Sequence, residues 1–144
     1  MKTFANSRVF DCPVLALPVV HNPAGNISYA NSRENIPFEI KRVYYLYDVP
    51  AGETRGGHAH RQLYELLFAA QGSYDVVLDD GNCKSIIHLN RPHLGLLIVP
   101  GIWRELINFS SGAISLVLAS EVYDESDYIR EYDQFIREKK PEQP

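Results

Sequence analysis

Short apolar runs separated by turn residues follow one another through the middle of the sequence, and this pattern constrains the fold more than any other feature. Residues 38–50, FEIKRVYYLYDVP, are β-branched and aromatic and lead into a turn signal. The stretch ELLFAAQGSYDVVLDDGNCKSIIHLN contains two apolar runs joined at an Asp-Asp-Gly turn, and LGLLIVPGIW and AISLVLASEVY supply further strands. Strands about every 8–12 residues, without helical periods between them, are typical of an antiparallel barrel or sandwich. The sequence therefore predicts an all-β fold.

The two ends of the chain differ from this middle part. Residues 124–138 are charged, with apolar side chains at helical spacing from Tyr128 to Ile136, which predicts one amphipathic C-terminal helix packed on the barrel. Residues 1–37 are less regular, and VLALPVV and GNISYA are candidate strands. An edge strand near the N-terminus is a natural element for exchange between subunits. We expect a single domain over 1–144, with the barrel at 38–123.

Composition and charge argue against several classes of function. The net charge of −4 over 144 residues disfavours broad binding to nucleic acid or acidic membranes, which requires a basic face. No run approaches the roughly 18 apolar residues of a membrane span. Cys12 and Cys83 have no metal or redox spacing and are expected to be free thiols. These features predict a cytoplasmic protein that binds neither nucleic acid nor a membrane.

A spaced set of glycine, histidine and glutamate residues lies between Gly52 and Gly72. The order is Gly52, five residues, His58, one residue, His60, four residues, Glu65, six residues and Gly72. This matches the first motif of the cupins, whose barrel is a double-stranded β-helix related to the jelly roll. On a strand, residues i and i+2 point to the same face, so His58 and His60 are expected to share the barrel interior.

Arg104 decides between a metal site and proton transfer. In metal-binding cupins a second motif supplies a third histidine, and the corresponding position here is Arg104. A guanidinium group has no lone pair for a metal and places a permanent positive charge where the cation would lie. We therefore expect no metal and no cofactor, with His58 and His60 moving protons next to a substrate carbonyl and Arg104 contacting an anionic or carbonyl oxygen.

Other polar residues are candidates for the same cavity. Arg42 and Tyr44 share one face of the strand in 38–50, and a tyrosine hydroxyl inside a barrel can bind a sugar oxygen or orient a histidine. Arg55 precedes the glycine pair and is placed to meet an anion at the cavity mouth.

Four stretches of the sequence resemble the bacterial sugar 3,4-ketoisomerases of the cupin superfamily, also known as WxcM-like proteins. They are NIPFEIKRVYYLYDVPAGETRGGHAH, VVLDDG, PGIWRELINFSS and LVLASEVYDESDYIREYDQFI, within roughly residues 35–137. The resemblance implies an enzyme without metal or nucleotide cofactor that moves the keto group of dTDP-4-keto-6-deoxyglucose from carbon 4 to carbon 3. The product would feed 3-amino-3,6-dideoxy sugars of surface polysaccharides such as lipopolysaccharide O-antigen or S-layer glycans. It also implies a homodimer with exchanged N-terminal strands.

The resemblance further implies roles for individual residues. His58 and His60 would be base and proton shuttle, with either assignment open, and Tyr44 would complete the catalytic set. Arg42 and Arg55 would line the sugar-diphosphate site.

Two positions depart from many relatives, and two other functions stay open. Arg104 stands where some members carry histidine, which favours the gluco configuration at carbon 4, and Ala24 stands where an arginine is common. The first alternative is a metal-dependent cupin enzyme that uses His58, His60 and Glu65 as ligands. The second is a cupin that binds a sugar nucleotide without turning it over.

Overall fold

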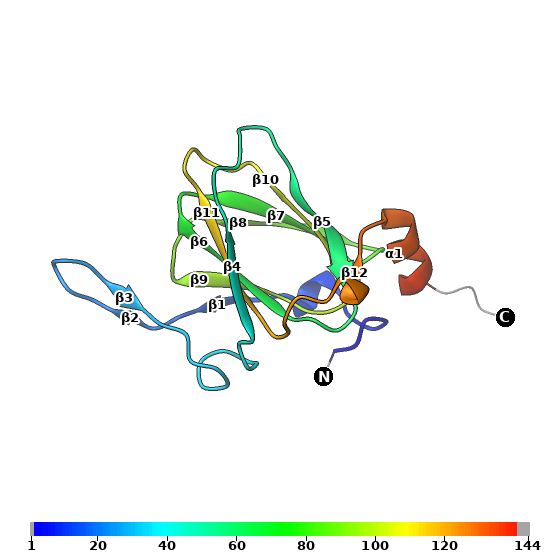
Figure 1. Cartoon of the computed structure of the whole chain (residues 1–144), viewed down its shortest axis with the longest axis horizontal. Helices are drawn as coiled ribbons and strands as arrows, with labels where there is room; N and C mark the ends of the chain where they lie inside the picture. Colours follow the sequence, from blue (N-terminus) through cyan, green and yellow to red (C-terminus); the bar gives the residue numbers. More distant parts are fainter. Residues whose placement is uncertain (1, 141–144) are drawn as a thin grey trace.

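The computed structural model describes residues 2–140, which form two five-stranded sheets, a separate two-stranded hairpin and one α-helix (Figure 1). The strands are β1 (Val14–Ala16), β2 (Val19–Val20), β3 (Ile27–Ser28), β4 (Arg42–Leu46), β5 (Arg55–His60), β6 (Glu65–Gln71), β7 (Tyr74–Asp79), β8 (Lys84–Leu89), β9 (Leu94–Ile98), β10 (Trp103–Ile107), β11 (Ile114–Ala119) and β12 (Tyr128–Ile129). The helix α1 spans Tyr132–Lys139, and two 3₁₀ turns span Val9–Asp11 and Glu125–Asp127.

The two large sheets face each other across the interior (Figure 1). One has the order β1-β9-β6-β11-β4 and the other β12-β5-β10-β7-β8, and every strand pair within them is antiparallel. Apolar side chains from both sheets fill one end of the space between them, among them Tyr74, Val76, Leu96, Ile98 and Val117. This arrangement confirms the predicted all-β, jelly-roll-like barrel with a C-terminal helix.

The hairpin of β2 and β3 projects away from the barrel (Figure 1). Its residues Val19, Val20 and Ile27 are all exposed, although each is apolar. The predicted N-terminal strands therefore exist, but within residues 2–140 the apolar side chains of β2 and β3 are not covered.

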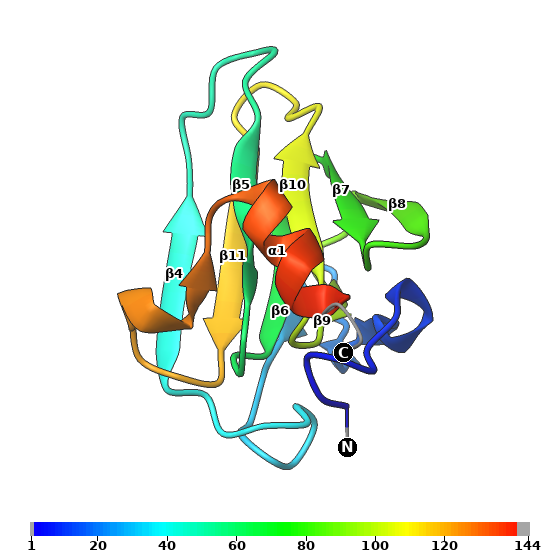
Figure 2. The ribbon, with the colours of Figure 1, turned by 90° about the vertical axis from the view of Figure 1, so that its right-hand side faces the viewer.

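The C-terminal helix is shorter than the predicted 124–138 and begins at Tyr132. Tyr128 and Ile129, which were assigned to the apolar helix face, instead pair as β12 with His60 and Ala59 of β5. Ile129 is buried there against the helix residue Phe135. Figure 2 shows α1 lying across the outside of β5 and β10. The apolar residues with helical spacing therefore fall in two elements, the strand β12 and the helix α1.

The predicted barrel limits, 38–123, are too narrow at both ends. Strand β1 pairs with β9, and β12 pairs with β5, so each large sheet takes an edge strand from outside that range. Cys12 and Cys83 are free thiols, as predicted. In the part of the chain that the structure describes, no helix is long and apolar enough to cross a membrane.

Candidate active site

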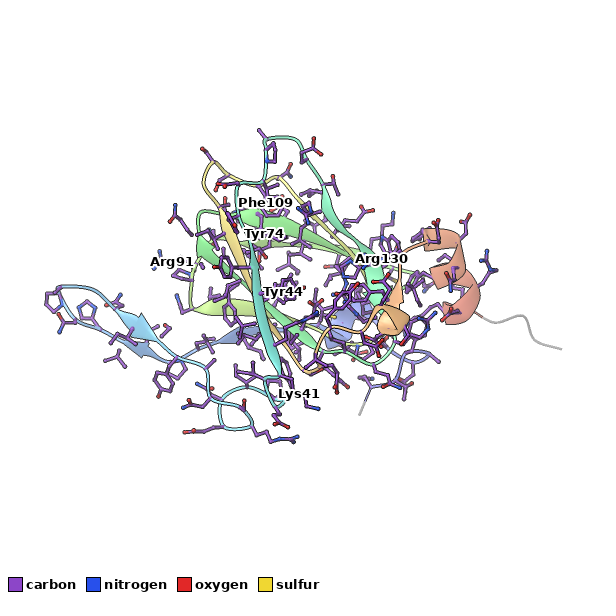
Figure 3. The ribbon with its side chains drawn as sticks, in the orientation of Figure 1. Lys41, Tyr44, Tyr74, Arg91, Phe109 and Arg130 are labelled. Atoms are coloured by element: carbon purple, nitrogen blue, oxygen red, sulfur yellow. The ribbon has the colours of Figure 1, made fainter. Side chains whose placement is uncertain are left out.

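A cavity of about 350 Å³ opens between the two sheets. Its polar lining includes Arg42, Tyr44, Arg55, His58, Glu65 and Arg104, together with Tyr123, Tyr128 and Arg130. Figure 3 shows Tyr44 near the middle of the barrel and Arg130 nearer to α1. Of the residues predicted to form the site, all but His60 line this cavity.

His58 presents a free imidazole nitrogen. Its Nδ1 lies 3.1 Å from the carbonyl oxygen of Gly56, which can only accept a hydrogen bond, so Nδ1 carries the proton. Nε2 is buried and has no hydrogen-bond partner among the described residues. Burial, with the positive charge of Arg104 as the next cause, lowers the pKa of His58 to about 3. His58 is therefore a neutral base that lines the cavity.

Gly56 allows β5 to approach β10 at this point. Its φ of +89° is in the region that favours glycine, and a Cβ there would lie 3.2 Å from the carbonyl oxygen of Arg104. The register between β5 and β10 shifts next to it, between Arg104 and Glu105. The close approach sets His58 directly opposite Arg104 in the ladder.

His60 lies behind His58. It is 0% exposed, and the two ring centroids are 4.8 Å apart. Its Nδ1 is 3.1 Å from Oδ2 of Asp127, and its Nε2 is 3.4 Å from Oε1 of Glu65, an ion-pair distance whose geometry falls short of a hydrogen bond. The spacing of the histidines correctly predicted one shared face, but His60 is held between two carboxylates and does not line the cavity.

Glu65, Arg104 and Tyr44 form a buried charged cluster. Glu65 and Arg104 are each 1% exposed; Nη1 of Arg104 donates to Oε1 of Glu65, and the hydroxyl of Tyr44 donates to Oε2. Nε and Nη2 of Arg104 donate to the carbonyl oxygen of Ile102 at 3.3 and 3.1 Å. All three side chains therefore have fixed partners.

The cluster shifts the acidity of two of its members in opposite directions. Burial alone would raise the pKa of Glu65, but the nearby His60 ring and the charge of Arg104 outweigh it and hold that pKa well below its usual range. Burial, reinforced by the charge of Glu65, raises the pKa of Tyr44 well above its usual range. Glu65 is a carboxylate and Tyr44 a neutral phenol at neutral pH.

The same residues include a possible set of metal ligands. Ligand atoms of His58, His60 and Glu65 all lie within 4.8 Å of one another. However, the guanidinium group of Arg104 is already paired with the Glu65 carboxylate. A divalent cation here would compete with Arg104 for that carboxylate and be repelled by its charge. The donor set does not fit a metal ion well.

Arginine side chains also surround the mouth of the cavity. Nε and Nη2 of Arg42 are buried without a hydrogen-bond partner among residues 2–140, and its guanidinium group lies 4.9 Å from the centre of the Tyr44 ring. Arg55 is exposed at the rim. Arg130 lines the cavity too and forms a two-point ion pair with Glu125. These donors suit an anionic ligand.

The segment 121–130 was missed as part of the site. It supplies Tyr123, Tyr128 and Arg130 to the cavity wall and Asp127 to His60. The sequence prediction treated residues 124–138 as one helix, which would have turned these side chains around a helix axis. The signal that could have located the segment is Asp124, whose side chain accepts from the backbone N–H of Ser126 and starts a 3₁₀ turn instead.

Known proteins resemble this chain in both sequence and structure. Residues 10–140 match the model of the FdtA family, described as WxcM-like, C-terminal. A TDP-4-oxo-6-deoxy-alpha-D-glucose-3,4-oxoisomerase of Aneurinibacillus thermoaerophilus is 48% identical over 111 residues, which cover 77% of this chain and 80% of that protein.

Solved structures of two related proteins extend the comparison. QdtA, a sugar 3,4-ketoisomerase from Thermoanaerobacterium thermosaccharolyticum in complex with TDP, has a TM-score of 0.89 and 40% identity, covering 91% of this chain and 96% of that one. A mutant of QdtA was solved in complex with TDP-4-keto-6-deoxyglucose. WlaRB, a TDP-quinovose 3,4-ketoisomerase from Campylobacter jejuni, has a TM-score of 0.85 and 44% identity, covering 90% and 99%.

Proposed function

Because this chain belongs to the FdtA family of WxcM-like proteins, we propose that it is a sugar-nucleotide 3,4-ketoisomerase. It moves the keto group of dTDP-4-keto-6-deoxyglucose from carbon 4 to carbon 3, and the 3-keto product is suited to amination at carbon 3. The observation that carries this proposal is the unpartnered Nε2 of His58, a neutral base in a cavity that also holds a buried arginine.

In the reaction, His58 takes the proton from carbon 3. The electrons of that bond form a carbon–carbon double bond to carbon 4, and the ketone oxygen becomes the enediolate oxygen O4. The Tyr44 hydroxyl accepts the proton of O3 and delivers one to O4, so no proton is gained or lost overall. A proton from solvent then adds to carbon 4, and His58 gives the proton it took to solvent. His58 is the base because it lines the cavity, whereas His60 reaches the substrate only through Glu65.

Arg104 and the two arginines Arg42 and Arg55 bind different negatively charged groups of the substrate. Arg104 lines the cavity next to His58 and stabilises the negative charge that develops on the enediolate. Arg42, with two unpartnered N–H groups, and Arg55, at the rim, bind the diphosphate. Ala24, on the loop before β3, contributes no side-chain donor to either task.

The product has the gluco configuration at carbon 4. Arginine stays protonated and is a poor proton donor, so Arg104 does not deliver a proton to carbon 4 from its own side. In a gluco sugar, the hydrogens on carbons 3 and 4 lie on opposite faces of the ring. The proton that adds to carbon 4 therefore comes from solvent, on the face opposite to the one from which His58 removed the carbon 3 proton. The name of WlaRB supports this configuration, since quinovose is 6-deoxyglucose.

The protein acts as a homodimer with exchanged N-terminal strands. The projecting β2–β3 hairpin is apolar and exposed, and so are Val43 and Tyr45 of edge strand β4 and Tyr47 just beyond it. An uncovered apolar hairpin and an uncovered apolar sheet edge are the kind of surface that strand exchange would bury. Light scattering of the purified protein should give twice the mass of the 16.4 kDa chain.

Two free thiols fit a cytoplasmic location.

The test is turnover of dTDP-4-keto-6-deoxyglucose in deuterated water, followed by NMR of the sugar ring. We expect the 3-keto product, with deuterium confined to carbons 3 and 4. His58→Asn should lower kcat by about 10²–10⁴-fold, the usual contribution of a general base. His88→Asn is the matched control, because His88 pairs with Asp75 on the exposed side of β8. Binding without conversion, deuterium at carbon 5, or activity that requires added metal would contradict the proposal.

A further inference from the structure

We infer that Asp127 is a positioning residue that holds His60, and through it Glu65 and Tyr44, in their working geometry. This inference rests on the proposed isomerase reaction. Asp127 does not line the cavity, and its contact with His60 joins two parts of the chain 67 residues apart.

The contacts of Asp127 fix the orientation of the His60 ring. Oδ1 accepts from the backbone N–H of Gln62 at 2.8 Å, and Oδ2 accepts from that of Leu63 at 3.3 Å and from Nδ1 of His60 at 3.1 Å. The backbone carbonyl of Asp127 accepts from the N–H of Arg61 at 3.0 Å. Because three of these contacts go to the turn between β5 and β6, the carboxylate has little freedom to move away from His60.

The carboxylate also decides which nitrogen of His60 carries a proton. The hydrogen bonds from His60 and from the backbone hold the pKa of Asp127 low despite its partial burial, so it is ionised and can only accept. Nδ1 of His60 must then donate, and the ring is held with its Nε2 3.4 Å from Oε1 of Glu65. The ring is further enclosed by Tyr128, whose centroid is 4.3 Å away.

The effect reaches the substrate through Glu65. Glu65 accepts from the hydroxyl of Tyr44, and Tyr44 lines the cavity, where it exchanges the proton between the two substrate oxygens. A tilted His60 ring would no longer pack beside the Glu65 carboxylate, 3.4 Å from its Nε2, and would leave that carboxylate room to move. The order of contact is therefore Asp127, His60, Glu65 and Tyr44, from the edge of the barrel to the cavity.

A purely structural role has to be separated from this one, since Asp127 also ties β12 to the turn after β5. The variants are Asp127→Asn and, as a matched control, Asp124→Asn, whose carboxylate accepts only from Ser126 at the exposed 3₁₀ turn. We expect Asp127→Asn to lower kcat by at least about 10-fold, as for carboxylates that orient histidines elsewhere, with KM within about twofold. Asp124→Asn should leave both constants within about twofold, and Asp127→Glu, which keeps the charge, should recover part of kcat.

The outcomes separate this inference from the proposed function. A folded Asp127→Asn protein with unchanged kcat, even with a lowered melting temperature, overturns the inference. A second measurement covers two cases, one in which Asp127→Asn does not fold and one in which the wild type does not turn over the substrate. In either case, ¹⁵N NMR of histidine-labelled wild-type protein tests the inference. The His60 signals are assigned from their loss in His60→Asn. A protonated Nδ1 on His60 supports the inference, and an unprotonated Nδ1 overturns it. Absence of turnover by the wild type alone is a failure of the proposed function.

Discussion

Glu65→Gln tests the buried charge cluster, which is the feature that most distinguishes this cavity from a metal site. The substitution keeps the size of the side chain but removes the negative charge that faces Arg104, whose side chain is 1% exposed. Removing one partner of a buried ion pair costs about 3–5 kcal/mol, because the other charge is left without compensation. One amide oxygen also cannot satisfy both Arg104 and the Tyr44 hydroxyl, which now use separate oxygens.

The cost should be visible in equilibrium unfolding. For a chain of 144 residues, a loss of that size corresponds to a fall in melting temperature of roughly 8–15 °C. Glu125→Gln is the control, since the Glu125–Arg130 pair is about half exposed, with side chains 56% and 50% accessible, and an ion pair that is open to solvent contributes little to stability. If Glu65→Gln unfolds within 1 kcal/mol of the wild type in urea, the ion pair does not stabilise the fold as argued.

The role of Glu65 in the buried charge cluster can also be tested by measuring how the free energy of unfolding depends on pH. The folded-state pKa of Glu65 lies below the ordinary value of 4.5, so its contribution to stability is complete above pH 4.5 and is lost as the pH falls through the folded-state pKa. The wild type should therefore lose stability between pH 4.5 and 2 more steeply than Glu65→Gln. Parallel curves for the two proteins would contradict this assignment.

Two further predictions concern His58 and the packing of the first sheet. Because the pKa of His58 is lowered from 6.5 to about 3, the acid limb of kcat/KM should lie well below pH 6.5, and a limb between pH 6 and 7 would contradict the neutral base. Gly95→Ala would place a Cβ 2.5 Å from the buried ring of Phe68 on the neighbouring strand, so it should lower the free energy of unfolding by about 1–3 kcal/mol, measured in urea.

The strands could be predicted because alternation and turn residues are local signals. The Asp-Asp-Gly turn joins β7 to β8, where Asp80 accepts from the N–H groups of Asn82 and Cys83. The start of the helix could not be predicted in the same way, since β12 exists only because β5 offers it a free edge. A two-residue strand has too few residues to show a period of its own.

The candidate site was predicted in part, for a related reason. The spacing of His58 and His60 fixes their common face but not their depth, which depends on what covers each ring. His60 is covered by Tyr128 and bound by Asp127, both from a segment more than 60 residues away. Arg104 was expected to bind substrate; the structure gives it an internal partner, Glu65, as well as a place in the cavity wall.

In the reaction proposed above, Arg104 also explains how a weakly basic histidine, His58, removes a carbon-bound proton. In the free protein its charge, together with burial, keeps His58 unprotonated, so the base is available at neutral pH and below. When the proton leaves carbon 3, negative charge develops on the enediolate next to both side chains, and an adjacent negative charge raises the proton affinity of an imidazole. His58 thus becomes a stronger base as the reaction proceeds, while Arg104 stabilises the same negative charge. Because bound substrate brings its own diphosphate charge, the acid limb of kcat should lie at higher pH than that of kcat/KM, which reports on the free enzyme.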